Sequence, residues 1–239
     1  MDDARRTWAV VLAGGLGLRV GADRPKQLLE LGGRTVLERS VAAFVDHPRV
    51  DAVVLVCPPG RREEMAALVP QDVTTVEGGA ERSDSTRAGL TAAVVAGAAD
   101  DDRVLVHDAA RPLVAAETIS AVVEALDAHD VVALLVPTPD TIVRLDPSTG
   151  LPGPPIPRDE LRRHQTPQGF TLGVLERSHR EARCDASLVV TDDCTLVMTL
   201  VPEASVGVVY GDPRNLKITD PSDLLVARAL LAAEDDTPR

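Results

Sequence analysis

Residues 8–27 read WAVVLAGGLGLRVGADRPKQ, in which an unbroken apolar run, Trp8–Ala13, is followed at once by two glycines. A short continuous apolar run that ends in glycine is typical of a β-strand buried on both faces of a parallel sheet. A glycine turn after such a strand exposes backbone N–H groups, and it lets phosphate oxygens approach without obstruction by a Cβ atom. The stretch therefore predicts a first strand whose carboxyl end carries an anion-binding turn.

This turn matches neither of two common nucleotide-binding motifs. Val20 stands where a dinucleotide fingerprint needs its third glycine, and Gln27 stands where a P-loop needs Ser or Thr. What remains is a glycine turn followed by Arg19 and Lys26, two cations that could fold over a polyphosphate. A tight turn with two solvated cations is the alternative that the glycines alone leave open.

The rest of the chain alternates between β-branched runs and longer helical patterns, which is typical of βαβ units around a parallel sheet. The predicted strands are residues 53–56, 104–106, 131–136 and 206–209, and the predicted helices are residues 35–45, 61–68, 83–96, 115–128 and 221–233. The last helix has Asp220 as its N-cap and Pro221 at its first position. We therefore expect an α/β fold with a doubly wound, mostly parallel sheet and a ligand site at the carboxyl ends of the strands.

One segment breaks this alternation, because seven prolines fall between Pro137 and Pro157 around a short strand-like run at residues 141–145. Proline removes a hydrogen-bond donor and restricts φ, so this segment forms neither a core helix nor a central strand. The sequence beyond it supplies two or three helices and one strand, which is too little for a second core. We therefore predict a single domain over residues 1–239 with a projecting β-arm at about residues 137–160.

The composition excludes several classes of protein. The chain has 239 residues, and its 25 Lys and Arg against 37 Asp and Glu give a net charge of −12. Proteins that track nucleic acid need a basic face, and 2% aromatic residues leave no stacking platform for single strands. No apolar run reaches the roughly 18 residues of a membrane helix or has the pattern of a signal peptide. The three cysteines, Cys57, Cys184 and Cys194, form no CxxC pair, so we expect reduced thiols and a cytoplasmic protein. From the charge, the aromatic content and the apolar runs, we expect a protein that binds neither nucleic acid nor membrane.

A second glycine motif, GGAERSDSTRAGL, covers residues 78–90 and leads into a helix that Ser83, Asp84 and Ser85 would open. Its glycines would allow close approach of a nucleotide base, and a serine hydroxyl could discriminate the edge of that base. An ordinary capped loop is the alternative that this segment alone favours.

A third motif, VLVHDAARP, covers residues 104–112 and places Asp108 directly after a buried strand. A carboxylate at that edge of the sheet could hold Mg²⁺ through one oxygen, and Arg111 could make a bidentate contact to a phosphate. The alternative is a helix-capping aspartate paired with Arg111. His107 has no second histidine at metal-ligand spacing, so we interpret it as a structural hydrogen-bonding residue.

Six motifs occur in a fixed order from about Trp8 to about Leu231. They are AGGxGxR followed by PKQ, GGxxRxxS, HDAARP, TPQGF, TDD and NLKIT. In this order they resemble the 2-C-methyl-D-erythritol 4-phosphate cytidylyltransferase family, which joins CTP to a branched polyol phosphate and releases pyrophosphate. The resemblance implies the Rossmann-like sheet of the nucleotidyltransferase type, a divalent cation such as Mg²⁺, and a homodimer that exchanges its arms.

The resemblance also implies a role for individual residues. The CTP phosphates and ribose would lie against Ala13, Gly14, Gly15 and Gly17, and the cytosine against Gly79, Ala80 and Ser85. Charge on the attacked α-phosphate would be stabilised by Arg19, Lys26 and Lys217, with the metal on Asp108. The methylerythritol phosphate would be positioned by Arg111, Thr141, Arg158, Thr191 and Lys217.

These roles agree with the chemistry of nucleotidyl transfer. The attacking phosphate is already an anion, so the reaction needs cations and a metal rather than a strong general base. A nucleotide-binding protein without activity would have lost Arg19, Lys26, Asp108 or Lys217, yet all four are present.

The residues after the TDD motif depart from the family pattern. Cys194 and Thr195 replace an alanine and a serine, and Met198 stands where a glutamate is common. Ala80 stands where some members carry an acid. The alternative substrate is therefore ribitol 5-phosphate or another pentitol phosphate.

Overall fold

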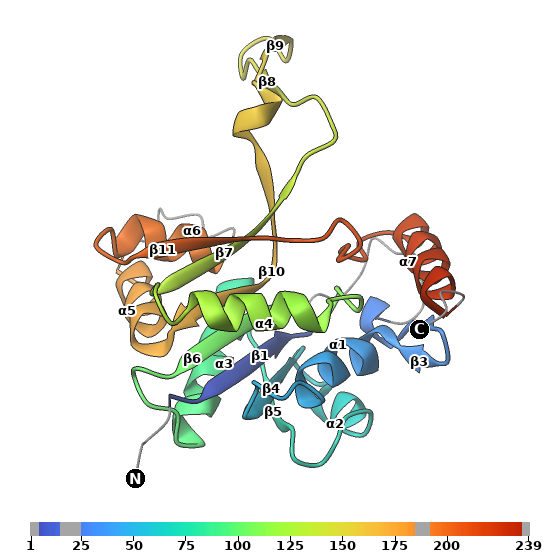
Figure 1. The fold of residues 1–239 in the computed structure, drawn as a ribbon, viewed down its shortest axis with the longest axis vertical. Coiled ribbons are helices and arrows are strands. Elements are labelled where there is room, and N and C mark those ends of the chain that lie inside the picture. Colours follow the sequence, from blue (N-terminus) through green and yellow to red (C-terminus); the bar gives the residue numbers. More distant parts are fainter. Residues whose placement is uncertain (1–4, 15–24, 185–191, 236–239) are drawn as a thin grey trace.

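The computed structural model describes residues 5–14, 25–184 and 192–235. Its centre is a seven-stranded sheet in the order β11-β7-β10-β6-β1-β4-β5 (Figure 1). The strands are β1 (Thr7–Leu12), β4 (Ala52–Cys57), β5 (Thr74–Glu77), β6 (Arg103–Asp108), β7 (Val131–Pro137), β10 (Arg162–Thr171) and β11 (Val206–Tyr210). All neighbouring strands run parallel except β10, which is antiparallel to both β6 and β7.

Helices cover both faces of the sheet because successive residues of each buried strand point to opposite sides. In β1, Ala9 and Val11 belong to the core under α1 (Val36–Val45), α2 (Arg62–Ala66) and α4 (Ala116–Ala125). Val10 and Leu12 belong to the core under α3 (Arg82–Val95), α5 (Leu172–Ala182) and α6 (Asp193–Leu200). This arrangement confirms the predicted doubly wound α/β fold.

A third, smaller core lies beside the sheet. The 3-10 helix η2 (Lys26–Leu28) leads into a short hairpin of β2 (Glu30–Leu31) and β3 (Arg34–Thr35), and this hairpin packs against α7 (Pro221–Asp235). Leu31, Ile218 and Leu224 are buried in the contact. As predicted, α7 begins at Pro221, and Asp220 Oδ1 accepts from the backbone N–H of Ser222 at 2.9 Å. Within the part of the chain that the structure describes, no helix is both long and apolar enough to cross a membrane.

The proline-rich segment projects from the end of the sheet (Figure 1). It carries a two-stranded ribbon of β8 (Val143–Leu145) and β9 (Pro152–Pro155), followed by the 3-10 helix η3 (Arg158–Glu160). The strand predicted at residues 141–145 is thus shorter by two residues. Leu145 and Leu151 are 58% and 64% exposed, so this projection buries little of its own apolar surface.

One sequence-based expectation about elements is wrong. The chain beyond the projection has two strands in the sheet instead of one, because β10 lies in its centre. No apolar pattern marks this strand in the sequence, because Gln165, Thr166 and Gln168 are polar yet buried. The helix predicted at residues 83–96 is present as α3, which begins one residue earlier at Arg82, with Glu81 as N-cap.

Candidate functional site

A cavity of about 250 Å³ lies at the carboxyl ends of β1, β5 and β6, as expected for a doubly wound sheet. Seven of the predicted site residues line it: Gly14, Lys26, Gly79, Ala80, Ser85, Asp108 and Lys217. Leu12, Gln27, Glu81, Arg82 and Ala110 complete the lining. Four further predicted residues, Gly15, Gly17, Arg19 and Thr191, lie outside the described residues. The structure therefore brings together residues from both the glycine motifs and the aspartate motif.

The glycines of the cavity allow the first turn of α3 to approach the sheet. A Cβ atom on Gly14 would lie 3.1 Å from Ser85 Oγ, and one on Gly79 would collide with the side chain of Asp84. Asp84 Oδ2 in turn accepts from the backbone N–H of Glu81 at 3.0 Å, which closes the start of the helix. Glycine is thus required for packing at position 79, and at position 14 a larger residue would press on the hydroxyl of Ser85.

Asp108 is the central carboxylate of the cavity. Its Oδ2 accepts from Lys217 Nζ at 2.7 Å, and its Oδ1 lies 3.6 Å from Arg82 Nε. Burial by itself would raise the pKa of Asp108, but Arg82, Lys217 and Arg111 together hold it well below its usual range. Asp108 does not cap a helix and does not pair with Arg111, so the alternative interpretation of this motif is wrong. It is an ionised carboxylate at the end of β6.

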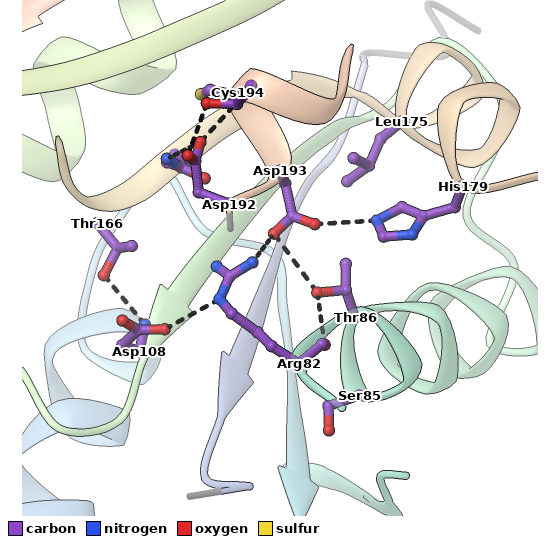
Figure 2. Close-up of polar contacts among 12 residues, drawn as sticks. Arg82, Ser85, Thr86, Asp108, Thr166, Leu175, His179, Asp192, Asp193 and Cys194 are labelled. Atoms are coloured by element: carbon purple, nitrogen blue, oxygen red, sulfur yellow. Dashed lines mark hydrogen bonds and ion pairs between the residues drawn. The ribbon is translucent and has the colours of Figure 1, made fainter. Parts of the chain in front are cut away.

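Arg82 connects Asp108 to a second buried carboxylate (Figure 2). Its Nη1 lies 2.6 Å from Oδ2 of Asp193, whose side chain is fully buried. Oδ1 of Asp193 accepts from His179 Nε2 at 2.9 Å, and Thr86 Oγ1 lies 3.4 Å from Oδ2. Sequence reasoning assigned no role to Arg82, Asp193 or His179. Arg82 and Asp193 lie inside two of the quoted motifs, which was the only signal available.

The two lysines of the chain both line this cavity, although every other basic residue among its 25 Lys and Arg is arginine. Lys26 Nζ donates to the backbone carbonyl of Ile218 at 2.8 Å, and Lys217 is the neighbouring residue. The contact from η2 to the 215–219 segment therefore connects the two lysine-bearing segments of the cavity wall. Lysine differs from arginine in being a compact point charge on a flexible stem.

Arg111 does not line the cavity. Its Nη1 donates to the backbone carbonyl of Asn215 at 2.7 Å, and its Nη2 donates to that of His164 at 3.4 Å. In this structure Arg111 therefore holds the segment that carries Lys217. The bidentate phosphate contact expected of Arg111 stays a prediction.

His107 has the structural role that its sequence context suggested. The ring is fully buried, with Nε2 3.1 Å from the carbonyl oxygen of Arg111 and Nδ1 3.2 Å from Thr166 Oγ1. Burial lowers its pKa to about 4, so the ring is neutral at physiological pH. His107 thus connects β6 to the antiparallel strand β10.

Thr141 and Arg158 lie at the base of the projection and are exposed. Arg158 Nη1 donates to the backbone carbonyl of Pro139 at 3.1 Å, which closes the base of the ribbon. Neither residue lines the cavity of its own chain.

Ala13 also lies outside the lining of the cavity. Its carbonyl accepts from Gln27 Nε2 at 3.0 Å, and this hydrogen bond connects the end of β1 to η2.

A second group of potential ligand atoms comes from His164, Asp192 and Cys194, whose atoms lie within 4.8 Å of one another. Asp192 caps α6, because its Oδ1 accepts from the backbone N–H of Thr195 and its Oδ2 from the Thr195 hydroxyl at 2.7 Å. The thiol of Cys194 is buried in the core, and this burial raises its pKa well above the usual value. We therefore interpret Asp192 as a helix cap and Cys194 as a core residue, and we do not interpret the three residues as a metal site.

Comparisons with known proteins agree with these features. The model of the 2-C-methyl-D-erythritol 4-phosphate cytidylyltransferase family matches residues 7–233. A protein of that name from Thermobifida fusca (strain YX) is 45% identical over 95% of this chain and 93% of its own length. The crystal structure of the protein of that name from Thermus thermophilus has a TM-score of 0.74 at 35% identity, covering 94% of this chain and 98% of that one.

A further relative has another name. The bifunctional ribulose 5-phosphate reductase/CDP-ribitol pyrophosphorylase of Haemophilus influenzae is 35% identical over 92% of this chain, which spans 47% of that longer protein.

Proposed function

The chain belongs to the 2-C-methyl-D-erythritol 4-phosphate cytidylyltransferase family and is an enzyme of that activity, and on this premise we propose which residues carry each part of the reaction. The reaction joins a phosphate oxygen of methylerythritol phosphate to the α-phosphorus of CTP. The bond from that phosphorus to the bridging β-oxygen breaks, so CDP-methylerythritol and pyrophosphate leave. No proton has to be removed from the nucleophile, and the enzyme's task is to bring anions together and to stabilise charge.

The CTP site is assigned to the wall formed by β1, the loop after β5 and the first turn of α3. The small residues Gly79 and Ala80 and the hydroxyl of Ser85 leave room for a pyrimidine and little for a purine. The backbone at Gly14, at the carboxyl end of β1, would approach the phosphates. This assignment is supported by the fact that all four residues line one cavity.

The residues around Asp108 fit a magnesium ion. Mg²⁺ prefers carboxylate oxygens and is usually held by one or two carboxylates together with substrate phosphates. Asp108 is ionised, ends a central strand, and faces a cavity that two lysines share. When bound, Mg²⁺ would neutralise charge on the phosphates of CTP. Asp108 would hold the ion, and Lys26 and Lys217 would turn from their present partners, the Ile218 carbonyl and Asp108, to the oxygens of the reacting phosphates.

The acceptor site is assigned to Lys217 and Arg111 of one chain, together with Thr141 and Arg158 of a second copy. Arg111 holds the backbone that carries Lys217, so it would orient this lysine toward the methylerythritol phosphate. Thr141 and Arg158 lie on an exposed projection and outside the cavity of their own chain. A homodimer in which each arm reaches the partner's cavity would bring Thr141 and Arg158 to the substrate.

A cytoplasmic location stays a prediction.

The observation that carries this proposal is the convergence of Asp108, Lys26 and Lys217 on one cavity at the carboxyl edge of the sheet. The test is pyrophosphate release from CTP with methylerythritol phosphate, ribitol 5-phosphate and erythritol phosphate in parallel. We expect turnover with methylerythritol phosphate to exceed that with the other two. Faster turnover with ribitol 5-phosphate would overturn the acceptor assignment and favour the activity named for the Haemophilus relative.

A further inference from the structure

Two carboxylates share the guanidinium of Arg82, and only one of them faces the cavity. Arg82 leaves the first turn of α3 and points between Asp108 and Asp193 (Figure 2). We propose that the buried Asp193 is a positioning residue for Arg82, and that it keeps the guanidinium from pairing fully with Asp108, so that Asp108 stays available to a divalent cation. This inference rests on the metal-binding role proposed for Asp108.

The distances show which carboxylate holds Arg82 more tightly. Arg82 Nη1 is 2.6 Å from Asp193 Oδ2, whereas Arg82 Nε is 3.6 Å from Asp108 Oδ1. The first is a charge-assisted hydrogen bond, and the second is an ion pair beyond hydrogen-bond distance. Burial by itself would lower the pKa of Arg82, but Asp193 and then Asp108 raise it above its usual value. Arg82 is therefore a permanent cation whose stronger partner is Asp193.

Asp193 is in turn fixed from several sides. Its carboxylate is fully buried at the first position of α6, where His179 of α5 donates to Oδ1 at 2.9 Å. Thr86, one turn along α3 from Arg82, lies 3.4 Å from the oxygen that Arg82 also contacts. Burial alone would raise the pKa of Asp193, but the bond from His179 and the charge of Arg82 hold it below its usual value. The negative charge that restrains Arg82 is thus itself held by the core.

The two cations on Asp108 differ in how easily they can leave. Lys217 is 41% exposed and sits on a flexible stem, so it can move from Asp108 to a phosphate when ligands arrive. Arg82 is 26% exposed and tied to Asp193. Without the charge of Asp193, the planar guanidinium could turn both of its donors onto Asp108 in a bidentate pair. Such a pair would compete with a metal for the same oxygens.

The first test is Asp193→Asn, which keeps the shape of the side chain and removes its charge. The protein is freed of metal with EDTA, saturated with CTP, and titrated with Mg²⁺ in the absence of any polyol phosphate, so that nothing turns over. The readout is the Mg²⁺-dependent rise in melting temperature. We expect the Mg²⁺ concentration at half effect to rise about tenfold, the lower end of what loss of an outer partner of a metal ligand costs.

The decisive variant is Arg82→Gln combined with Asp193→Asn. It removes the competing cation and leaves a neutral pair able to hydrogen bond in the core. The proposal predicts that the double variant regains most of the Mg²⁺ response that Asp193→Asn loses. A merely structural role of Asp193 predicts a response at least as weak as that of the single variant, and this result would overturn the proposal.

Two further variants keep the outcome unambiguous. Arg82→Gln alone should lower the Mg²⁺ requirement below that of the wild type, which tests the same competition if Asp193→Asn does not fold. Asp127→Asn removes an exposed ion pair with Arg103, away from the cavity, and should respond as the wild type does.

Asp108→Asn separates this inference from the proposed function. If Asp108→Asn responds to Mg²⁺ as the wild type does, the metal-binding role of Asp108 is wrong. If Asp108→Asn loses the response while Asp193→Asn keeps it, only the role of Arg82 and Asp193 is wrong.

Discussion

The proposed nucleotide half of the site (Gly14, Gly79, Ser85 and Asp108) and its proposed acceptor half (Lys217, with Thr141 and Arg158 of the arm) are built in different ways. Residues of the nucleotide half end or directly follow the parallel strands β1, β5 and β6, or lie in the first turn of α3. The carboxyl ends of parallel strands meet at one edge of a sheet, so local sequence determines where these residues lie. Their contacts come from distant parts of the chain, but the strand pattern alone predicts the edge of the sheet that they share.

The acceptor half depends on long-range contacts. Lys217 lies in a segment without regular structure, which Arg111 holds through the carbonyl of Asn215, 104 residues away in sequence. Thr141 precedes β8 and Arg158 begins η3, so both belong to the arm that extends away from the sheet (Figure 1). The location of the nucleotide half can thus be predicted from the strand pattern, whereas the acceptor half becomes apparent only from contacts between distant segments.

The largest effect should come from Lys26, where the two halves meet. We expect Lys26→Ala to reduce kcat by about 100- to 1000-fold with a smaller change in CTP affinity, because its charge matters most in the transition state. Lys26→Arg should recover little, since a planar guanidinium does not replace a point charge. Steady-state kinetics would check this, with Arg62→Ala on the exposed side of α2 as control. Weakened CTP binding with unchanged kcat would make Lys26 a ground-state contact of the nucleotide half alone.

The stability of the contact between β6 and β10 should depend on pH through His107. Its pKa is about 4 in the folded protein against 6.5 as its ordinary value, so the unfolded chain binds a proton first as the pH falls. The free energy of unfolding should therefore decrease between about pH 6.5 and pH 4, by about 3 kcal/mol in total from this group. Urea denaturation at a series of pH values would measure it. A variant such as His107→Gln should flatten this part of the profile, and an unchanged profile would contradict the assignment.

The nucleotide half should discriminate the base by itself. A site that hydrogen-bonds the 4-amino edge of cytosine leaves a buried group unpaired with uracil, at a cost of about 1–3 kcal/mol. We expect kcat/KM for CTP to exceed that for UTP by the corresponding factor, about 5- to 150-fold. Equal use of the two nucleotides would show that the segment at residues 79–85 is an ordinary capped loop with the first turn of its helix. Variants of the arm should leave this ratio unchanged.

Two inactive variants, one defective in the cavity and one in the arm, should complement each other when their chains are mixed. Mixing inactive Lys26→Ala with inactive Arg158→Ala protein should restore activity if each arm serves the partner's cavity. Random re-pairing puts about half of the dimers in the mixed state, and one of their two sites is intact, so recovery should approach about a quarter of wild type. No recovery after re-pairing, or a monomer in sedimentation, would place Arg158 at its own chain's site or remove it from the site.

Much of the fold was determined by local pattern. The unbroken apolar run of β1, buried on both faces, and the glycines after it led to the sheet and to its ligand edge. Capping signals at Asp220 and Pro221 placed the start of α7. These features are predictable because each depends on backbone preferences and burial within a few residues.

Tertiary structure alone decided the rest. The antiparallel strand β10 carries buried polar side chains whose partners lie elsewhere, as when Gln168 Nε2 donates to Asp192 Oδ1 at 3.1 Å. The bridge from Asp108 through Arg82 to Asp193 includes one ion pair, Arg82 with Asp193, whose members lie 111 positions apart in sequence. Charge pairing across such distances leaves no periodicity in the sequence, because the side chains involved meet only when the helices pack on the sheet.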